Sequence, residues 1–322
     1  MLTMLWGLES DGPLAAVCEA LHDVGAPALL LDQRRVTETE FCVQDEASLT
    51  GYVRYGDRRV ALEEITGWYV RPYDTRRVAA VERAGPGSTL WQHSLRLEDA
   101  LLGWLETTSA RVVNRPSAMQ PNGCKPYQLQ LVARAGFAIP ETLVTTDPEE
   151  VRAFWGRHGE VIYKSISGVR SQVTRLGPGD RERLQDVVHC PTQFQEYIAG
   201  RDYRAHVVGD AVFACEVRSN TDDYRYGSPG GELRIWAARL PPEIEARAIA
   251  MTKAMGLEVS GIDLRRTPQG QWYCFEVNPS PGFTFYEQFA GQDLARVIAS
   301  HLISIAPGPA RSNSACAVSR YL

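Results

Sequence analysis

The chain has 322 residues, of which 44% are hydrophobic and 23% charged, and its formal net charge is −5. A chain of this size can bury a sizeable core and is long enough for two or three subdomains. The acidic balance argues against nucleic acid as the main partner, because proteins that neutralise a phosphate backbone carry a basic surplus. These values predict a soluble globular protein of enzyme size.

The chain shows no signal for a membrane or for secretion. Its apolar stretches are short or interrupted by polar residues, so we expect no transmembrane helix. Residues 1–7 are apolar but lack the basic region of a signal peptide. The 7 cysteines are scattered without paired spacing, which fits reduced thiols better than a zinc site or a disulfide framework. We therefore expect a cytoplasmic protein with no membrane partner.

The N-terminal residues predict a parallel β-α-β unit. Residues 1–8 have the pattern of a buried strand, residues 12–24 that of a helix after a Ser-Asp-Gly-Pro start signal, and residues 28–31 that of a second strand. Such a unit begins an α/β domain with a parallel sheet. The turn after the first strand lacks the three glycines of a dinucleotide-binding fold, so an NAD enzyme is set aside.

The rest of the N-terminal third combines short strands with one helix. One strand ends in Trp68-Tyr69-Val70-Arg71-Pro72, and its two aromatic residues are as typical of a packed core as of a functional site. The expected elements are strands at 41–43, 49–55, 59–62 and 65–70, a helix at 94–107, and a strand and turn at 111–116.

Two strand-like runs near the C-terminus, 259–264 and 272–277, are separated by a Thr-Pro-Gln-Gly turn and predict an antiparallel hairpin. Period-two alternation places Glu276 and Asn278 on one face, where Asp263 of the neighbouring strand can join them. Two carboxylates and one carboxamide suit Mg²⁺ or Mn²⁺, which take oxygen ligands. For two strand carboxylates alone, solvated acids at a hairpin edge are the better explanation.

The residues around this hairpin resemble a known family. The run Glu276-Val277-Asn278-Pro279-Ser280-Pro281-Gly282, preceded by Gly261-Ile262-Asp263, resembles the metal-binding strands of the ATP-grasp carboxylate–amine ligases. The segments Asn114-Arg115-Pro116 and Asn122-Gly123-Cys124-Lys125, with a helix at 127–135, are similar to the start of the ATP-grasp domain. The resemblance spans about residues 111 to 305.

The resemblance implies a set of residues that bind ATP. Lys125 at a helix start and Lys164 at a strand end occupy the places of two lysines that contact the nucleotide, and a small-residue loop after Lys164 closes over the phosphates. Taken alone, Lys125 would be a solvated cation set against the helix dipole, which favours a phosphate partner. Residues 196–198 resemble the hinge that holds adenine through backbone groups, with an acid near the ribose. The implied nucleotide-binding residues are Lys125, Lys164, Ser167, Gln195, Glu196, Tyr197, Ile198 and Asp202, and the implied metal ligands are Asp263, Glu276 and Asn278.

Three arginines are the candidate catalytic anion clamps: Arg204, Arg218 and Arg225. The reaction that the resemblance implies makes an acyl phosphate from a carboxylate and ATP, after which a nucleophile displaces phosphate. Arginine suits the charge that builds up in these steps, because its planar fork binds two oxygens and stays protonated. Any one of the three, taken alone, could instead form a surface ion pair.

The residues that select the substrate point to two classes. Asp223-Tyr224-Arg225 resembles the Asp-Trp-Arg of microviridin-type peptide cyclases, and the strand that ends in Arg71-Pro72 resembles one in ATP-grasp enzymes that modify ribosomal peptides. Asn278-Pro279-Ser280-Pro281-Gly282 instead follows the glutamate ligases that modify a ribosomal protein. The leading hypothesis is a ligase that joins a side-chain carboxylate to a hydroxyl or amine within a ribosomal peptide, as in graspetide-type macrocyclisation. The alternatives are a ligase for small amino-acid or peptide substrates, including glutamate addition, and a nucleotide-binding scaffold without catalysis.

The predicted fold class is α+β with an α/β N-terminal domain, and the resemblance implies an ATP-grasp fold that holds its nucleotide between two subdomains. The expected cofactors are ATP and Mg²⁺ or Mn²⁺. The expected partners are a peptide or amino-acid substrate and a second copy of the chain in a homodimer. The expected boundaries are an N-terminal domain at 1–110, a central lid at 111–190, a C-terminal subdomain with the metal site at 191–306, and a mobile tail at 307–322.

Overall fold

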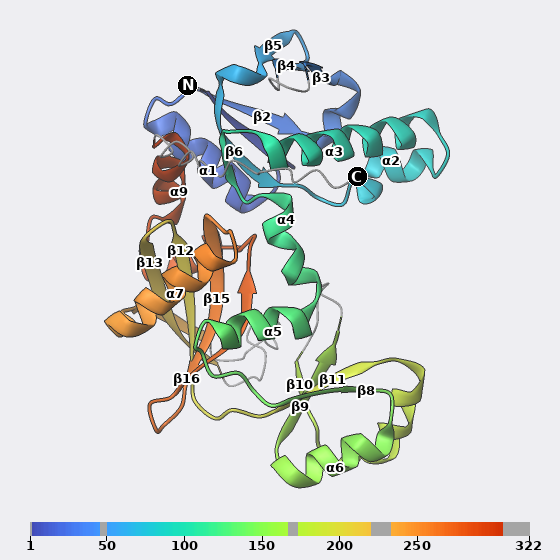
Figure 1. Cartoon of the computed structure of the whole chain (residues 1–322), viewed down its shortest axis with the longest axis vertical. Helices are drawn as coiled ribbons and strands as arrows, with labels where there is room; N and C mark the ends of the chain where they lie inside the picture. The colour runs from blue at the N-terminus through green and yellow to red at the C-terminus, as the bar shows by residue number, and fades with distance from the viewer. Residues whose placement is uncertain (1, 46–49, 167–172, 220–232, 305–322) are drawn as a thin grey trace, which may run out of the picture.

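The computed structural model describes residues 2–45, 50–166, 173–219 and 233–304 (Figure 1). The expected tail at 307–322 lies outside these residues, as do Ser167 and Arg225 among the predicted site residues. No helix of the described ranges is both long and apolar enough to cross a bilayer.

A parallel sheet with the order β2-β1-β6-β7 forms the N-terminal part, as the β-α-β pattern predicts. Residues of β1 and β6 are buried on both faces, because α3 covers one face and α1 covers the other. Trp68 and Trp104 pack edge to face across the α3 side, with 5.4 Å between ring centroids. The bounds are β1 Leu2–Gly7, α1 Gly12–Asp23, β2 Ala28–Asp32, β6 Ile65–Arg71, α2 Ala79–Ala84, α3 Thr89–Thr107 and β7 Arg111–Val113.

A three-stranded antiparallel sheet, β3-β4-β5, adjoins the α3 side of the parallel sheet. Val53 and Val60 of this small sheet belong to the same hydrophobic cluster as Trp68 and Leu105. Its strands are β3 Thr39–Asp45, β4 Thr50–Tyr55 and β5 Arg58–Ala61.

The last described helix, α9 (Leu294–Ile303), also packs on the parallel sheet. Its Leu294 and Ile298 share a hydrophobic cluster with Leu14 of α1 and Leu5 of β1. Figure 1 shows α9 beside α1. The N-terminal core therefore contains a helix from the far end of the chain, which a boundary at residue 110 does not include.

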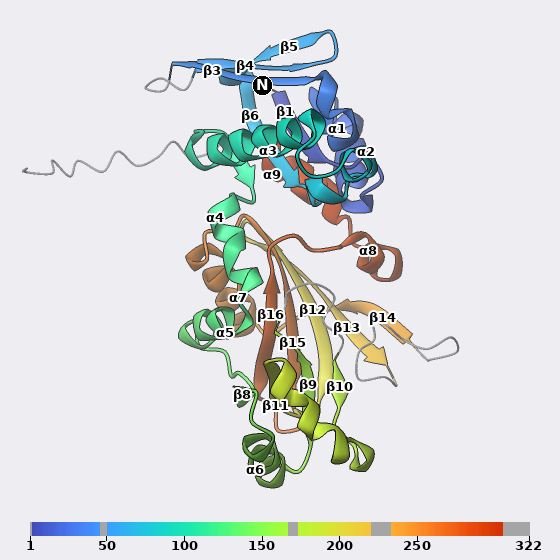
Figure 2. The same ribbon diagram turned by 90° about the vertical axis from the view of Figure 1, so that its right-hand side faces the viewer.

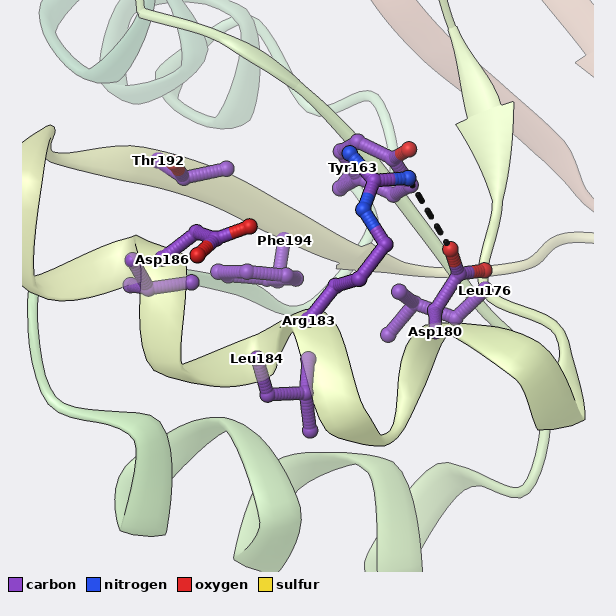
Figure 3. Close-up of a pocket in the computed structure, with 9 residues that line it drawn as sticks. Tyr163, Leu176, Asp180, Arg183, Leu184, Asp186, Thr192 and Phe194 are labelled. Atoms are coloured by element: carbon purple, nitrogen blue, oxygen red, sulfur yellow. Dashed lines mark ion pairs between the residues drawn. The ribbon is translucent and has the colours of Figure 1, made fainter.

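The lid is an antiparallel sheet with the order β10-β9-β11-β8. The helix α6 and the 3₁₀ segment η6 cover one of its faces, where Phe154, Leu184 and Phe194 form the core. A cavity of about 140 Å³ lies on this side of the sheet. Figure 3 shows side chains that line it, among them Arg183 and Asp180, which form an ion pair. The bounds are β8 Thr142–Thr145, α6 Pro148–His158, β9 Val161–Ser165, β10 Thr174–Arg175, η6 Glu182–His189 and β11 Thr192–Glu196.

The lid differs from the expected range of 111–190 at both ends. Strand β11 pairs with β8 and β9, so the lid sheet continues past residue 190. Helix α5 (Lys125–Arg134) instead packs on β16 of the next sheet. A strand belongs to the sheet with which it exchanges backbone hydrogen bonds, wherever it lies in the chain order.

A five-stranded antiparallel sheet with the order β14-β13-β12-β15-β16 lies between the N-terminal part and the lid (Figure 2). One face is apolar and packs on α7 and α5, with Ala205, Ile262 and Val277 at its centre. The opposite face carries the charged residues described below. The bounds are α4 Pro116–Met119, β12 Arg201–Val208, β13 Ala211–Ser219, β14 Leu233–Ala238, α7 Pro242–Ala254, β15 Val259–Arg266, β16 Trp272–Asn278 and α8 Thr284–Ala290.

Candidate functional site

A row of charged residues crosses three strands of the five-stranded sheet. Arg204 of β12 lies directly opposite Asp263 of β15, and Asp263 lies directly opposite Glu276 of β16. Residues directly opposite each other in a sheet place their side chains on the same face. Arg204 Nη1 donates to Asp263 Oδ1 at 2.6 Å.

A bulge in β16 determines which of its side chains lie on the same face of the sheet as Arg204 and Asp263. The pairing passes from Asp263 with Glu276 to Leu264 with Cys274, so Phe275 is the extra residue of a bulge. As a result Cys274 and Val277 are both buried in the apolar core. Glu276 is directed to the opposite face, and Asn278, opposite Gly261, follows it. The structure thus brings Asp263, Glu276 and Asn278 together on adjoining strands.

The donors of this cluster fit a hard divalent cation. Asn278 Oδ1 accepts from Ser280 N at 2.8 Å and keeps a second lone pair. Within the described residues, no group of three or more His, Cys, Asp and Glu side chains could hold a metal ion. A Mg²⁺ ion here would therefore use the two carboxylates, the amide oxygen and further oxygens from water or phosphate.

The guanidinium of Arg204 is held in a tight space, and its side chain is only 7% exposed. Arg204 Nε donates to His206 Nε2 at 3.4 Å, and the ring of Tyr286 lies 5.6 Å from Arg204 Cζ. Gly261 leaves room for the guanidinium, since a Cβ there would lie 2.2 Å from Arg204 Nη2. Burial, followed by the positive charge of Arg204, lowers the pKa of His206 well below its usual value. His206 is thus a neutral neighbour of Arg204 at neutral pH.

Two buried amides, Gln128 and Asn114, hold the strands of this cluster in place. The sequence analysis names Asn114 only as part of a family-like segment and does not name Gln128. Gln128 of α5 donates from Nε2 to Val277 O at 2.7 Å and accepts from Val277 N at 3.1 Å. Asn114 donates to Pro279 O at 2.5 Å and accepts from Val259 N at 3.1 Å. Gln128 was detectable as a polar residue beside the apolar face of a predicted helix, but its partner, 149 residues away, was not.

Helix α5 begins at Lys125, the predicted phosphate lysine. The two hydrogen bonds of Gln128 tie the first turn of this helix to β16. The structure therefore joins the element that carries Lys125 to the strand that carries Glu276 and Asn278.

The second predicted lysine lies on the lid. Lys164 of β9 is directly opposite Gln193 of β11, and Ile162 is directly opposite Gln195. Phe194, between the two glutamines, packs into the lid core. Lys164, Gln193 and Gln195 therefore share the lid face that is turned away from that core.

The predicted hinge connects the lid to the five-stranded sheet. The backbone N–H groups of Glu196 and Tyr197 donate within the lid, to Glu141 O at 3.1 Å and Glu160 O at 3.0 Å. Arg265 donates from Nη1 to Ile198 O at 2.8 Å.

Asp202, the predicted ribose acid, lies next to this hinge. It forms a forked ion pair with Arg265, at 2.6 Å from Nε and 3.0 Å from Nη2. Asp202 is two residues before Arg204 on β12, so both side chains lie on the face of Asp263.

The structure does not bring Arg218 to this face. Arg218 is three residues along β13 from Cys215, which is opposite Arg204, so alternation directs Arg218 to the other side. There its Nε lies 3.6 Å from Glu216 Oε1, and its side chain is 61% exposed. Arg218 thus lies on the opposite face of the sheet from Arg204 and Asp263. Arg225 and Ser167 lie outside the described residues.

Comparison with known proteins gives relatives of two kinds. The chain is 28% identical over 221 residues to beta-citrylglutamate synthase B of Danio rerio, a match that covers 64% of this chain and 54% of that protein. It is 27% identical to a probable alpha-L-glutamate ligase of Chromohalobacter salexigens, covering 86% of this chain and 88% of that protein.

A solved structure matches over nearly the whole chain. The ATP-grasp ligase PsnB, in complex with a minimal precursor, Mg and ADP, has a TM-score of 0.77 and 26% identity, covering 94% of this chain and 96% of PsnB.

A family model, the RimK-like ATP-grasp domain, matches residues 124–302. These findings confirm the predicted ATP-grasp fold, the α+β class and the ligase class, and ligases of this family use ATP with Mg²⁺, as predicted. The chain belongs to the family of RimK-like ATP-grasp ligases.

Proposed function

We propose that this chain is a Mg²⁺-dependent peptide ligase that uses ATP to join an Asp or Glu side-chain carboxylate of a ribosomal peptide to a hydroxyl or amine. The observation that carries this proposal is the similarity to PsnB, which extends over 94% of this chain and includes the N-terminal domain. Another structure of PsnB was solved in complex with the precursor peptide PsnA2 and AMPPNP. The expected product is an ester or amide linkage within the peptide.

Residues from both sheets would hold MgATP in this proposal. Lys164, Gln195 and the hinge at 196–198 would bind the nucleotide from the lid side, and Lys125 would bind its phosphates from the start of α5. Asp263, Glu276 and Asn278 would hold Mg²⁺ on the five-stranded sheet. The bound ion would neutralise the charge on the phosphates during transfer.

The chemistry has two steps. A carboxylate oxygen of the peptide attacks the γ-phosphorus of ATP, and ADP leaves with the bonding electron pair, which gives an acyl phosphate. The hydroxyl or amine then attacks the carbonyl carbon, loses its proton and expels inorganic phosphate. Arg204 is buried and fixed by Asp263, so it would stabilise oxyanion charge in these steps with little reorganisation. Closure of the lid would exclude water, which otherwise hydrolyses the acyl phosphate.

A second candidate is a ligase that adds glutamate or another small amino acid. It is supported by the glutamate-ligase relative that spans 86% of this chain, and by the ending Asn278-Pro279-Ser280-Pro281-Gly282. The acceptor would then be a free amino acid instead of a second side chain of the same peptide.

One experiment separates the two candidates. The protein is incubated with ATP, Mg²⁺ and the precursor peptide encoded by a neighbouring gene, and the products are analysed by mass spectrometry. Peptide ligation predicts the loss of one water per linkage. An unchanged peptide mass, with ADP release stimulated by free glutamate, would contradict it and support glutamate addition. The homodimer is a further part of this proposal, which light scattering of the purified protein would test.

A further inference from the structure

Three polar atoms on the nucleotide-facing side of the lid have no hydrogen-bond partner within the described residues. They are Gln193 Nε2, Gln193 Oε1 and Gln195 Oε1. Both side chains are buried, with relative exposures of 0% for Gln193 and 1% for Gln195. A buried polar group without a partner destabilises the fold, because its hydrogen bonds to water are lost and not replaced. Such groups call for a ligand or another functional reason.

The position of the two glutamines limits what the ligand is. Gln193 is directly opposite Lys164, the predicted nucleotide lysine. Gln195 uses its Nε2 to donate to Thr142 Oγ1 at 2.9 Å, which leaves its Oε1 as an acceptor. Both face away from the cavity of Figure 3, which lies on the Phe194 side of the sheet. The unpartnered atoms therefore belong to the face that would meet the nucleotide.

The three unpartnered atoms are two carbonyl acceptors, Gln193 Oε1 and Gln195 Oε1, and one amide donor, Gln193 Nε2. Adenine offers a complementary set along one edge, where the 6-amino group donates and N7 accepts, and a glutamine carboxamide can bind both atoms at once. Guanine presents only acceptors there, O6 and N7, so an acceptor of the lid would face an acceptor of the base. Adenine satisfies this set of atoms and guanine does not.

We propose that Gln193, assisted by Gln195 Oε1, binds the N6–N7 edge of the adenine base and sets the preference of this enzyme for ATP over GTP. The inference rests on the proposed function, because it takes the lid face to be the nucleotide site. It adds a base-specific side-chain contact at a residue that neither the sequence patterns nor the predicted hinge included.

The unpartnered atoms of Gln193 also predict that replacing this residue with an apolar one stabilises the nucleotide-free protein, although it weakens nucleotide binding. Leucine has nearly the volume of glutamine and carries no polar group, so Gln193→Leu should raise the melting temperature of the nucleotide-free protein. Gln193 would thus be retained at a cost to folding, as expected of a binding residue. Gln185 of η6 is an exposed glutamine in the same lid, so Gln185→Leu is the matched control.

The test is calorimetric titration of the full chain with ADP and with GDP in the presence of Mg²⁺. The wild type should bind ADP more tightly than GDP. Gln193→Leu should weaken ADP binding about ten- to hundredfold and leave GDP binding unchanged, so the ADP preference falls. Gln193→Asn, which keeps a carboxamide, should retain more of the preference, and Gln185→Leu should retain all of it.

A nucleotide analogue makes the test sharper. 7-Deaza-ADP lacks the N7 acceptor, so it should bind the wild type more weakly than ADP does and bind Gln193→Leu as ADP does. Equal loss of ADP and GDP binding in Gln193→Leu, or no loss of either, would overturn the inference. A wild type that binds ADP well but shows no preference over GDP would also overturn it, while the proposed function would survive. A wild type that binds neither nucleotide would overturn the proposed function itself, and this inference with it.

Discussion

Arg71 Nη1, at the end of β6, donates to Ser280 Oγ at 2.9 Å, in the loop that follows β16. The same nitrogen donates to Pro281 O at 3.1 Å, and Arg71 Nε donates to Asp11 Oδ1 at 2.7 Å. Asp11 is in turn the N-cap of α1. One guanidinium therefore joins the N-terminal sheet and its first helix to the loop beside the candidate metal ligand Asn278.

Replacing Arg71 should weaken both the fold and the site. Arg71→Ala should lower the free energy of unfolding by about 2–3 kcal/mol, because it leaves partly buried acceptors without their charged donor. Arg71→Lys should recover only part of this, since an ammonium cannot serve Asp11 and Ser280 with a planar fork. Urea denaturation measures both variants. Arg77→Ala, at an exposed arginine, is the control and should change stability by less than about 0.5 kcal/mol.

The acidic pair of the hairpin should control the metal dependence of turnover. We expect Asp263→Asn and Glu276→Gln each to lower the rate of ATP-dependent ligation by about 10²–10³, as for other groups that stabilise transition-state charge. The variants should also need more Mg²⁺ for half-maximal rate. Asp210→Asn, an exposed acid at the β12–β13 turn, is the control. Unchanged cellular activity of the Asp263 and Glu276 double variant would favour the scaffold without catalysis.

Two glycines should respond in opposite directions to the same change. Gly261→Ala places a Cβ 2.2 Å from Arg204 Nη2 and 2.7 Å from Pro281 Cβ, so it should displace Arg204 and destabilise the protein by about 1–3 kcal/mol. Gly103→Ala, in α3 and with no atom within 4 Å of the new Cβ, should stabilise by about 0.5–1 kcal/mol. Thermal unfolding and the ligation rate check both. Full activity in Gly261→Ala would show that the position of Arg204 is not critical.

His206 should make stability depend on pH. Arg204 and Tyr286 both lie against its ring. Burial and the Arg204 charge lower its folded-state pKa, so below an unfolded pKa of about 6.5 the unfolded chain binds the extra proton. His206 therefore makes its full contribution to the free energy of unfolding above about pH 6.5. Below that pH the free energy of unfolding falls by about 1.4 kcal/mol per pH unit, until the folded-state pKa of His206 is reached.

The variant His206→Leu tests this dependence. Its free energy of unfolding, measured between pH 7.5 and pH 5, should have a slope smaller by that amount than the slope of the wild type. Equal slopes for the two proteins would mean that His206 is not the titrating group.

The hairpin of the candidate metal site could be predicted from the sequence, because strand periodicity and turn composition are local signals. The bulge at Phe275 could not. Strict alternation places Cys274 on the face of Glu276, whereas the structure buries Cys274 with Val277. The extra residue of the bulge shifts the inward–outward alternation of β16 by one position. Nothing in the local pattern of a single sequence marks the position of such a bulge.

Contacts between residues far apart in the chain also could not be predicted from the sequence. The partners of Gln128 and Asn114 on β15 and β16 lie more than a hundred residues away, and α9 packs beside α1 from the other end of the chain. Alternation directs Arg218 of β13 away from Arg204, but this follows only once the pairing of Cys215 with Arg204 is known from the structure. The family resemblance gave the ATP-grasp fold, but it gave no information about the unpartnered Gln193.

The most direct test of the central claim follows one oxygen atom through the reaction. The precursor peptide is labelled with oxygen-18 in its Asp and Glu carboxylates and incubated with the enzyme, ATP and Mg²⁺. Phosphoryl transfer to the carboxylate predicts that one labelled oxygen appears in inorganic phosphate for each water lost from the peptide. Release of unlabelled phosphate, or label found in AMP, would contradict the account.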